Sequence, residues 1–380
     1  MKTVLHLTCD FPDPMVGAKT KGVVNYIDNT QGYRHVVYSL NRASWRKNIV
    51  AVPFGDDRTA VAYGAPPKGI MLATRLRTLG EWIMGDLESK GITPDVIHAH
   101  KLSVEGLLAH DLHAHLGAPY ICSIWGDTDL KIMRTRRDLR SSWEKVLGSA
   151  SRLLPVAPWA ADRFVKEFGA DPEKMSVLLP IVGGTEFFEP AIASQPRLVT
   201  LFNLDAYKRK NLLGLIHAVR QLRKDNPALT LDIFGAGGPE TLCDIDAAIE
   251  AVGAREFIKL QGRLPAGAFE TTLNSYTAFV MPTSRETFGM VFVEALFCGL
   301  PVLYTKGWSI DGLFPPEQIG YAWNGREQAD IERGLRHLMS NEEALKHSIR
   351  QLEVAGEFDQ FKKPNIIARY ASILDEVSQR

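Results

Sequence analysis

The sequence predicts an α/β protein with two successive doubly wound, parallel-sheet domains. Short apolar runs of β-forming residues alternate with longer helical patterns along the 380 residues, an order that is typical of parallel sheets joined by crossover helices. The alternation stops in an aperiodic stretch at residues 183–196 and then starts again. A chain of this length also holds more than one hydrophobic core.

The first half contains six short runs that we expect to form strands, at residues 4–8, 36–40, 96–99, 120–124, 153–156 and 176–179. Helical patterns lie between them, for example at residues 102–115 and 160–168. The stretch 183–196, which begins Gly-Gly-Thr and includes Pro190 and Pro196, has no useful period and is predicted to be a linker.

The second half repeats the pattern, with expected strands at residues 198–202, 229–234, 257–260, 278–281, 302–304 and 321–323. The expected helices lie around residues 212–222, 244–252 and 291–297, and an apolar stripe predicts a last helix at 362–377. We expect domains at residues 1–190, with the last helix (about 362–380) added, and at 191–361. Ligands of such sheets bind at the carboxyl ends of the strands, so two domains that face each other would share a cleft.

Composition and charge exclude several function classes. Lys plus Arg equals Asp plus Glu at 44 each, so no overall field favours nucleic acid or an anionic membrane. The N-terminal segment is too short and polar for a signal peptide, and no apolar stretch is long enough to span a bilayer. Cys9, Cys122, Cys243 and Cys298 fit no metal-ligand or disulfide spacing. We therefore expect a cytoplasmic protein with buried free thiols.

The most specific segment spans residues 282–302 and combines a strand, a loop, a helix, a glycine stop and a second strand. Glu286 falls in the loop at the carboxyl end of the strand, and Glu294 lies about two turns into the cleft-facing side of the helix. Gly289 lets backbone N–H groups at the helix N-terminus approach a ligand, which suits diphosphate or sugar oxygens.

This segment resembles the E-x₇-E signature of the family-4 retaining glycosyltransferases, which have the GT-B fold of two Rossmann-like domains facing across a cleft. The resemblance implies that Glu286 holds the donor sugar and Glu294 the nucleotide ribose. The backbone around Phe288, Gly289 and Met290 would also face the donor. Thr287 stands where the family usually has glycine.

Three further loops of the second half resemble donor-binding elements of the same family. Gly235 and Gly237 follow a strand and would form a backbone cradle for the donor. Lys210 matches a lysine that neutralises the departing diphosphate, while Leu204 occupies the position of its arginine partner. Lys208 or Arg209 would then have to compensate. The donor's base would border a loop that includes Arg263 and Leu264.

The first half matches the family less closely, and its expected acceptor or cleft residues are Gly17, Lys19, Lys21, His98, Trp125 and Asp127. His98 ends a strand, where it either contacts a ligand or is held by protein partners. Trp125 occupies a position that is commonly histidine. Tryptophan cannot act as a base, and its indole donates a single hydrogen bond.

Two clusters leave alternatives open. His110, His113 and His115 are better explained as solvated helix-end side chains than as metal ligands, since no carboxylate or cysteine completes a set. The stretch 130–147 interleaves basic and apolar residues. It is either a solvated helix with its apolar stripe inward or a surface for an anionic or polyprenyl-linked acceptor at a membrane.

The resemblance implies a metal-independent retaining transfer of a hexose-type sugar. The donor would be a nucleotide-diphosphate sugar, and the acceptor a glycan, glycolipid or lipid-linked molecule of cell-surface polysaccharide or glycolipid biosynthesis, with no cofactor. Alternatives are a sugar-nucleotide epimerase or phosphorylase on the same fold, or a non-catalytic sugar-nucleotide binder. A nicotinamide-dependent dehydrogenase is disfavoured because residues 235–238 lack the G-x-G-x-x-G spacing.

Overall fold

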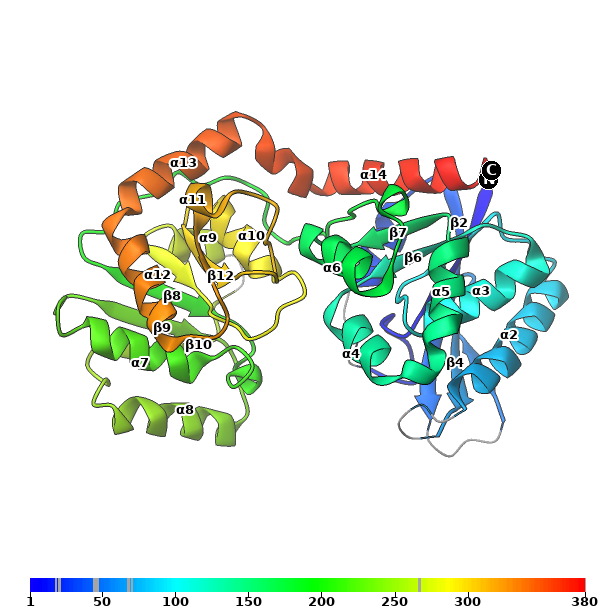
Figure 1. The fold of residues 1–380 in the computed structure, drawn as a ribbon, viewed down its shortest axis with the longest axis horizontal. Helices are drawn as coiled ribbons and strands as arrows, with labels where there is room; N and C mark the ends of the chain where they lie inside the picture. Colours follow the sequence, from blue (N-terminus) through cyan, green and yellow to red (C-terminus); the bar gives the residue numbers. More distant parts are fainter. Residues whose placement is uncertain are drawn as a thin grey trace. The chain divides into compact units, whose positions relative to one another are not determined.

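The computed structural model describes residues 1–17, 19, 22–43, 48–66, 69, 71–265 and 268–379. The chain forms two compact units, each with its own sheet and helices (Figure 1). Unit 1 comprises Met1–Val156, Ala160–Ile181 and Lys363–Arg380, and unit 2 comprises Ala157–Trp159 and Val182–Lys362. Apart from Ala157–Trp159, unit 2 begins at Val182, before the boundary at residue 190 that the sequence suggested.

Unit 1 contains a seven-stranded sheet in the order β3-β4-β2-β1-β5-β6-β7. Its strands are β1 (Lys2–Thr8), β2 (Tyr33–Ala43), β3 (Val50–Pro53), β4 (Arg58–Gly64), β5 (Val96–Ala99), β6 (Tyr120–Ile124) and β7 (Arg152–Pro155). All neighbours are parallel except β3 and β4. The strand order reverses between β1 and β5, so the carboxyl ends of these two strands mark the position where sheets of this kind bind ligands.

Two strand predictions for unit 1 need correction. The antiparallel edge pair β3 and β4 was not predicted. Residues 176–179 are not a strand, although their backbone runs beside β7: the Ser176 N–H donates to Leu153 O at 2.9 Å and the Leu178 N–H to Pro155 O at 3.0 Å. Residues 176–179 are therefore attached to β7 by two backbone hydrogen bonds without forming a strand.

The helices of unit 1 are α1 (Gly22–Asn29), α2 (Leu72–Ser89), α3 (Glu105–Leu116), α4 (Asp127–Thr135), α5 (Arg140–Ser149), α6 (Pro158–Phe168) and α14 (Lys363–Val377). α2 shows why they form: Leu72, Leu76, Leu79, Ile83 and Leu87 recur at helical spacing and are all buried. The central strands are buried along most of their length, as expected for a parallel sheet covered by helices.

Unit 2 contains a six-stranded parallel sheet in the order β10-β9-β8-β11-β12-β13. Its strands are β8 (Arg197–Leu201), β9 (Thr230–Phe234), β10 (Ile258–Gly262), β11 (Ala278–Val280), β12 (Val302–Thr305) and β13 (Gly320–Trp323). Each strand coincides with a predicted run to within two residues at either end. The strand order reverses between β8 and β11, which makes the loops after these strands the expected ligand-binding edge.

The helices of unit 2 are α7 (Leu212–Leu222), α8 (Pro239–Ala251), α9 (Phe269–Leu273), α10 (Met290–Phe297), α11 (Pro316–Ile319), α12 (Gln328–Ser340) and α13 (Glu342–Val354). α7 has the predicted bounds, because Leu212, Leu215, Ile216, Val219 and Leu222 form one buried face. Within the described part of the chain, no helix combines the length and the apolar character needed to cross a membrane.

The cysteines are free thiols, but they do not share one environment. Cys122 and Cys298 are buried in the core, as expected, and Cys9 is partly buried. Cys243 is exposed on α8, so the prediction that all four would be buried was wrong at this position. α8 carries only a narrow buried stripe, Ile245 and Ile249, and Cys243 lies outside it.

Candidate active site

The loop between β11 and α10 carries the first expected glutamate, and backbone hydrogen bonds hold it in place. The Ser284 N–H donates to Arg209 O at 2.9 Å, which ties this loop to the one that follows β8. The Ser309 N–H donates to Glu286 O at 3.0 Å from the other side. Both ends of the loop are therefore anchored at the carboxyl edge of the sheet.

Two predicted site residues far apart in the sequence meet directly at this edge. Lys210 Nζ forms an ion pair with Glu286 Oε2, and Arg209 Nη1 lies 3.8 Å from the same oxygen. Lys210 is buried; burial lowers its pKa, while the Glu286 carboxylate acts in the opposite direction. The pair keeps a cation and an anion together in a largely desolvated place, which strengthens their field.

Gly289 makes the turn into α10 and brings the backbone close to Glu286. Its φ of 70° lies in the left-handed region, and an added Cβ would lie 2.7 Å from the Phe292 ring and 3.0 Å from Glu286 Cγ. Phe288 is buried, whereas Met290 is exposed at the first position of the helix. Because the Phe288 ring is in the core, this residue can meet a ligand only through its backbone.

Glu294 is the fifth residue of α10, little more than one turn from its start. Its Oε1 accepts a hydrogen bond from the Gly183 N–H at 3.3 Å. The second glutamate therefore reaches backbone of the predicted linker stretch, and a bound ribose would compete with that weak hydrogen bond.

The loop after β9 is built around two glycines. Gly235 has φ of 148°, and an added Cβ would lie 2.0 Å from Phe202 O. A Cβ added at Gly237 would lie 3.0 Å from Cβ of Leu204. Leu204, at the arginine position of the family pattern, is fully buried beneath this loop. It acts as a packing residue, so it cannot be half of a diphosphate clamp.

The predicted donor residues of three loops line one groove of about 650 Å³ in unit 2. Its lining comprises Leu201, Phe202, Asn203, Asp205, Gly235, Ala236, Gly237, Arg263, Leu264, Pro265 and Phe269. Apolar side chains with a few backbone and charged groups suit a nucleoside. Lys208 is exposed with its ammonium 5.4 Å from the Tyr207 ring centroid.

In unit 1 the predicted residue His98 is a core residue. It is fully buried; Nδ1 pairs with the Tyr370 hydroxyl at 2.7 Å and Nε2 with Ser123 Oγ at 2.8 Å. Burial lowers its pKa to about 3. Of the two roles considered for His98, these partners favour the structural one. His100, two residues further along the chain, was not selected from the sequence; it is buried, and its Nδ1 has no hydrogen-bond partner among the described residues.

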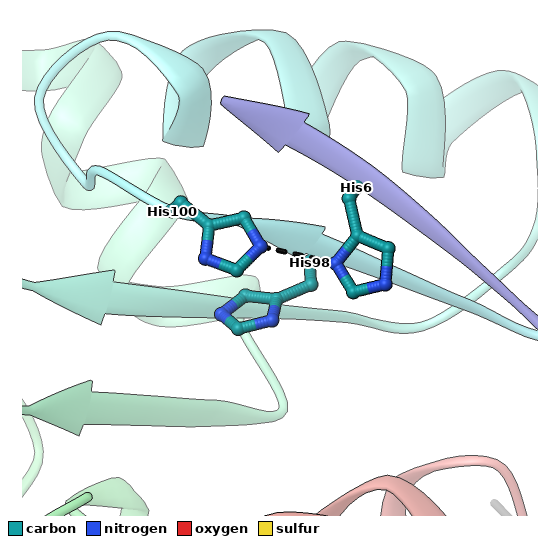
Figure 2. A group of neighbouring side chains, drawn as sticks. All are labelled: His6, His98 and His100. Carbon is teal, nitrogen blue, oxygen red and sulfur yellow. Dashed lines mark hydrogen bonds between the residues drawn. The ribbon is translucent and has the colours of Figure 1, made fainter. Parts of the chain in front are cut away.

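His6, His98 and His100 lie close enough to be considered as a metal site, since one ring nitrogen of each lies within 4.8 Å of the others (Figure 2). The ring centroids of His98 and His100 are 3.8 Å apart with the planes tilted by 33°, and His6 Nδ1 is paired with His100 Nε2 at 3.0 Å. Both ring nitrogens of His98 are engaged, by the Tyr370 hydroxyl and by Ser123 Oγ. The arrangement therefore favours hydrogen bonding over metal coordination.

The remaining acceptor predictions have mixed outcomes. Lys19 Nζ is 2.7 Å from Asp13 Oδ2 and also reaches Ser39 Oγ at 3.0 Å. It is therefore not free to face phosphate. Gly17 has open space around its Cα, and Lys21 lies outside the described residues. Asp127 is the first residue of α4, beside Gly126 with φ of 88°.

Trp125 follows β6 and packs against the start of α1. A Cβ at Gly22 would lie 3.0 Å from the Trp125 ring, so the two elements are in close contact. The indole Nε1 is buried and has no partner among the described residues. Its one hydrogen-bond donor is thus available to a ligand.

The basic stretch 130–147, predicted as one helix, is two helices separated by a 3₁₀ turn at Arg137–Leu139. Its apolar residues Leu130, Met133, Leu139, Trp143 and Leu147 are all buried, as expected for a helix that packs inward. A groove of about 690 Å³ nevertheless lies here, lined by Met133, Arg134, Arg137, Arg140, Trp143, Glu144, Leu147, Glu167 and Phe168. The helix-end histidines lie elsewhere, and each bonds to a nearby group: His110 to Ser149 Oγ, His113 to Ala118 O and His115 to Asp111 O.

Sequence reasoning missed several residues that shape the site. Asp205 Oδ1 accepts from the Gly238 N–H at 2.9 Å and from Thr241 Oγ1 at 2.8 Å, so it anchors the start of α8 from another loop. Thr305 donates to the carbonyl of Thr283 and thus supports the Glu286 loop from β12. These contacts join segments distant in sequence, and no local pattern signals them.

Family models match both units. The model of the glycosyl transferases group 1 matches residues 185–353, and that of a glycosyl transferase 4-like domain matches residues 29–180. A D-inositol 3-phosphate glycosyltransferase of Streptomyces bingchenggensis is 27% identical over 63% of this chain and 55% of its own length. One from Paenarthrobacter aurescens is 24% identical over 64% of each chain. The chain thus spans less than two thirds of these curated relatives.

Solved structures share the fold at low identity. Sucrose-phosphate synthase from Thermosynechococcus elongatus has a TM-score of 0.70 at 14% identity, covering 99% of both chains. The lipopolysaccharide outer core galactosyltransferase WaaB has a TM-score of 0.68 at 15% identity, covering 97% of this chain and 99% of its own. Anabaena HepE in complex with UDP has a TM-score of 0.67 at 14% identity, covering 99% and 100%. All are two-domain GT-B proteins.

Proposed function

Because this chain belongs to the group 1 glycosyl transferases and has the GT-B fold, we propose that it is a retaining, metal-independent hexosyltransferase. Its donor is a nucleotide-diphosphate sugar, and its acceptor is a glycan, glycolipid or lipid-linked molecule of cell-surface biosynthesis. The observation that carries the proposal is the Lys210–Glu286 pair at the carboxyl edge of the unit 2 sheet. The groove of about 650 Å³ lies at the same edge.

The donor binds in the groove of unit 2, with its base near Arg263 and Leu264. Gly235 and Gly237 let the diphosphate approach the backbone, because a side chain at Gly235 would collide with Phe202 O. Glu294 takes the ribose hydroxyls in exchange for the Gly183 N–H, and Glu286 takes hydroxyls of the sugar. Curated relatives named for inositol 3-phosphate suggest that a polyol acceptor is within the range of the family.

In the reaction, the bond between C1 of the sugar and the diphosphate oxygen breaks, and its electron pair stays on the diphosphate. Lys210 and Arg209 lie where they can stabilise that charge, together with the N–H groups at the start of α10. An acceptor hydroxyl attacks C1 from the face that the diphosphate leaves, and a diphosphate oxygen takes its proton. The anomeric configuration is therefore retained.

The basic stretch 130–147 extends the proposal to a membrane-linked acceptor. Lys131 and Arg137 are exposed and have no ion-pair partner in the part of the chain that the structure describes, while Arg134 is paired with Glu167 at 2.6 Å. The groove beside them has an apolar floor that includes Met133, Trp143 and Phe168. Such a surface suits anionic amphiphiles.

A thermal-shift screen with UDP, GDP, ADP and TDP sugars tests the proposal. One of these donors at 100 times its Kd should stabilise the protein by about 2.7 kcal/mol. The same donor should be consumed when a suitable acceptor is added. Stabilisation without transfer to any glycan, polyol or lipid acceptor would favour a non-catalytic binder. Conversion of the donor alone to an isomer would favour an epimerase.

A further inference from the structure

A chain of histidines runs across three adjacent strands of unit 1. His6 lies on β1, His35 on β2 and His100 directly after β5, and β1 lies between the other two. Figure 2 shows His6 and His100 turned toward each other above His98. Burial lowers the pKa of His6, His35 and His100, so each ring is neutral near pH 7 and carries one N–H.

The order of the hydrogen bonds fixes where each proton lies. His35 Nε2 is 2.8 Å from Thr30 O, and a carbonyl only accepts, so Nε2 of His35 carries the proton. Its Nδ1 is then a lone pair, which accepts from His6 Nε2 at 2.9 Å. His6 Nδ1 is in turn a lone pair, which accepts from His100 Nε2 at 3.0 Å. The chain leaves Nδ1 of His100 as a bare lone pair.

That terminal lone pair is buried and without a protein partner. His100 is 1% exposed, and its Nδ1 finds no hydrogen-bond donor among the described residues. Ser103 Oγ, Glu105 Oε2 and Trp125 Nε1 are also buried and have no hydrogen-bond partner among the described residues. His100 and Trp125 follow the neighbouring strands β5 and β6, and β5 borders the reversal of strand order. A buried unpaired polar atom is costly, so each of these atoms is a candidate contact for a polar ligand group.

The charges nearby favour an uncharged ligand group. A bare lone pair repels phosphate or carboxylate oxygens and binds a group that brings a proton. Two lysines of unit 1 are engaged by carboxylates: Lys101, which follows His100, has Nζ 2.6 Å from Asp10, and Lys19 has Nζ 2.7 Å from Asp13. Trp125 Nε1 adds an unused donor. A hydroxyl group both donates and accepts, whereas an ammonium group could not use this indole N–H.

We propose that His100 Nδ1 accepts a hydrogen bond from a neutral hydroxyl of a polyol or sugar acceptor, and that His6 and His35 are positioning residues that hold His100 in the required tautomer. This inference rests on the proposed transferase function. It adds a specificity-determining residue: unit 1 selects an uncharged hydroxyl at this point, even where the rest of an acceptor carries phosphate.

Nitrogen NMR of the full chain with ¹⁵N-labelled histidine tests the tautomer without any ligand. Two-bond proton–nitrogen correlations at pH 7 should show Nε2 protonated and Nδ1 unprotonated in His6, His35 and His100. In His35→Gln, which loses the Nδ1 acceptor, His100 should populate both tautomers. A wild-type His100 that is protonated at Nδ1 would overturn the proposal.

Titration with D-glucose, D-mannose, D-galactose and myo-inositol tests the ligand class, with inorganic sulfate, which carries no proton at pH 7, as the charged comparison. At least one polyol should move the His100 Nδ1 resonance, and sulfate should not. Movement by sulfate alone, or by none of these probes, would contradict the assignment.

Two variants of His100 separate recognition from structure. His100→Asn keeps an acceptor near the Nδ1 position but loses the bond to His6, whereas His100→Gln keeps that bond and loses the acceptor. His100→Gln should weaken polyol binding about 3- to 12-fold, and His100→Asn should stay within about threefold. The reverse order would assign His100 a purely structural role. Both variants should bind the donor in unit 2 as the wild type does. If the wild type itself bound no nucleotide-sugar donor, that result would count against the transferase function rather than against the role of His100.

Discussion

The two units treat the polar groups at their strand ends differently. In unit 2 the side chains beside the strand reversal are charged and paired: Lys210 with Glu286, and Arg209 at 3.8 Å from the same carboxylate. In unit 1 the corresponding edge holds neutral histidines, a buried Glu105 and an indole N–H, and several of these have an atom without a partner among the residues that the structure describes. Paired charges suit a ligand that develops charge, and unpaired neutral groups suit hydroxyls. The contrast is the basis on which we assign the donor to unit 2 and the acceptor to unit 1 in the proposed reaction.

The largest effect is expected from the charged pair of unit 2. Glu286→Ala should lower kcat about 100- to 1,000-fold, because it removes a contact to the reacting sugar and the anion that sustains the pKa of Lys210. The affinity of the Glu286→Ala variant for the free nucleotide diphosphate should stay nearly intact. Steady-state kinetics with the full donor and calorimetry with the nucleotide measure the two quantities.

Glu294→Ala is the matched control, since Glu294 lies on the same segment but is assigned to the ribose. It should weaken free nucleotide and donor alike by roughly 10- to 150-fold, the loss of one hydrogen bond to a charged group. Equal losses of nucleotide affinity in both variants would mean that the two roles are wrongly assigned. Normal turnover in Glu286→Ala would remove the segment from the active site.

A neutral site in unit 1 predicts an unusual pH dependence at Glu105. Burial raises the pKa of this fully buried carboxyl to about 7, above the value of about 4.3 in an unfolded chain. Between these values the folded state binds the extra proton, so stability falls as pH rises from about 4.5 to 7. Glu105→Gln removes this loss and should be more stable than the wild type at pH 8 by roughly 3 kcal/mol.

Chemical denaturation of both forms at pH 4.5 and pH 8 measures the difference. The two forms should be similar at the lower pH, because the carboxyl is then protonated in both states. If Glu105→Gln were the less stable form at pH 8, the carboxylate would be charged and held by Lys101, and unit 1 would resemble unit 2 more than we infer.

Some features of the two candidate sites could be predicted from the sequence, and others could not. In unit 2 the positions of Glu286 and Lys210 at strand ends were predictable because each lies in a short motif whose geometry is local: Gly289 starts α10 with φ of 70°, and Lys210 lies in the loop after β8. The sequence showed that Leu204 replaces the arginine of the clamp, but it could not show that this side chain packs beneath Gly235, because such packing is not a local property. His100 could not be chosen over His98 because the decision depends on His6 and His35, which lie elsewhere in the chain.

A smaller effect is expected at the basic stretch of unit 1. Lys131→Glu combined with Arg137→Glu should weaken binding to anionic liposomes about 25-fold or more, since each basic residue near such a surface contributes about 1 kcal/mol. Neither residue has an ion-pair partner in the described ranges, so the reversal breaks no known contact. Lys224→Glu with Arg326→Glu in unit 2 changes the net charge equally and should bind as the wild type does. If both double variants bound anionic liposomes equally well, residues 130–147 would have only a structural role.

The smallest effect is expected from removing divalent metal ions, and it tests whether the charges of unit 2 suffice for the leaving diphosphate. Two carboxylates at the carboxyl edge of the unit 2 sheet are already engaged: Asp205, which lines the groove, accepts from the Gly238 N–H and Thr241 Oγ1, and Glu286 is paired with Lys210. They are therefore poor candidates to hold Mg²⁺ or Mn²⁺ at the diphosphate. In the proposed reaction the negative charge of the diphosphate is stabilised by Lys210, Arg209 and the N–H groups at the start of α10 instead of by a metal ion. Excess EDTA should therefore change the transfer rate by less than about twofold, and added Mn²⁺ should not raise it. A rate that EDTA abolishes and Mn²⁺ restores would show that the paired cations are not enough, and that the charge stabilisation assigned to unit 2 comes from a bound metal ion instead.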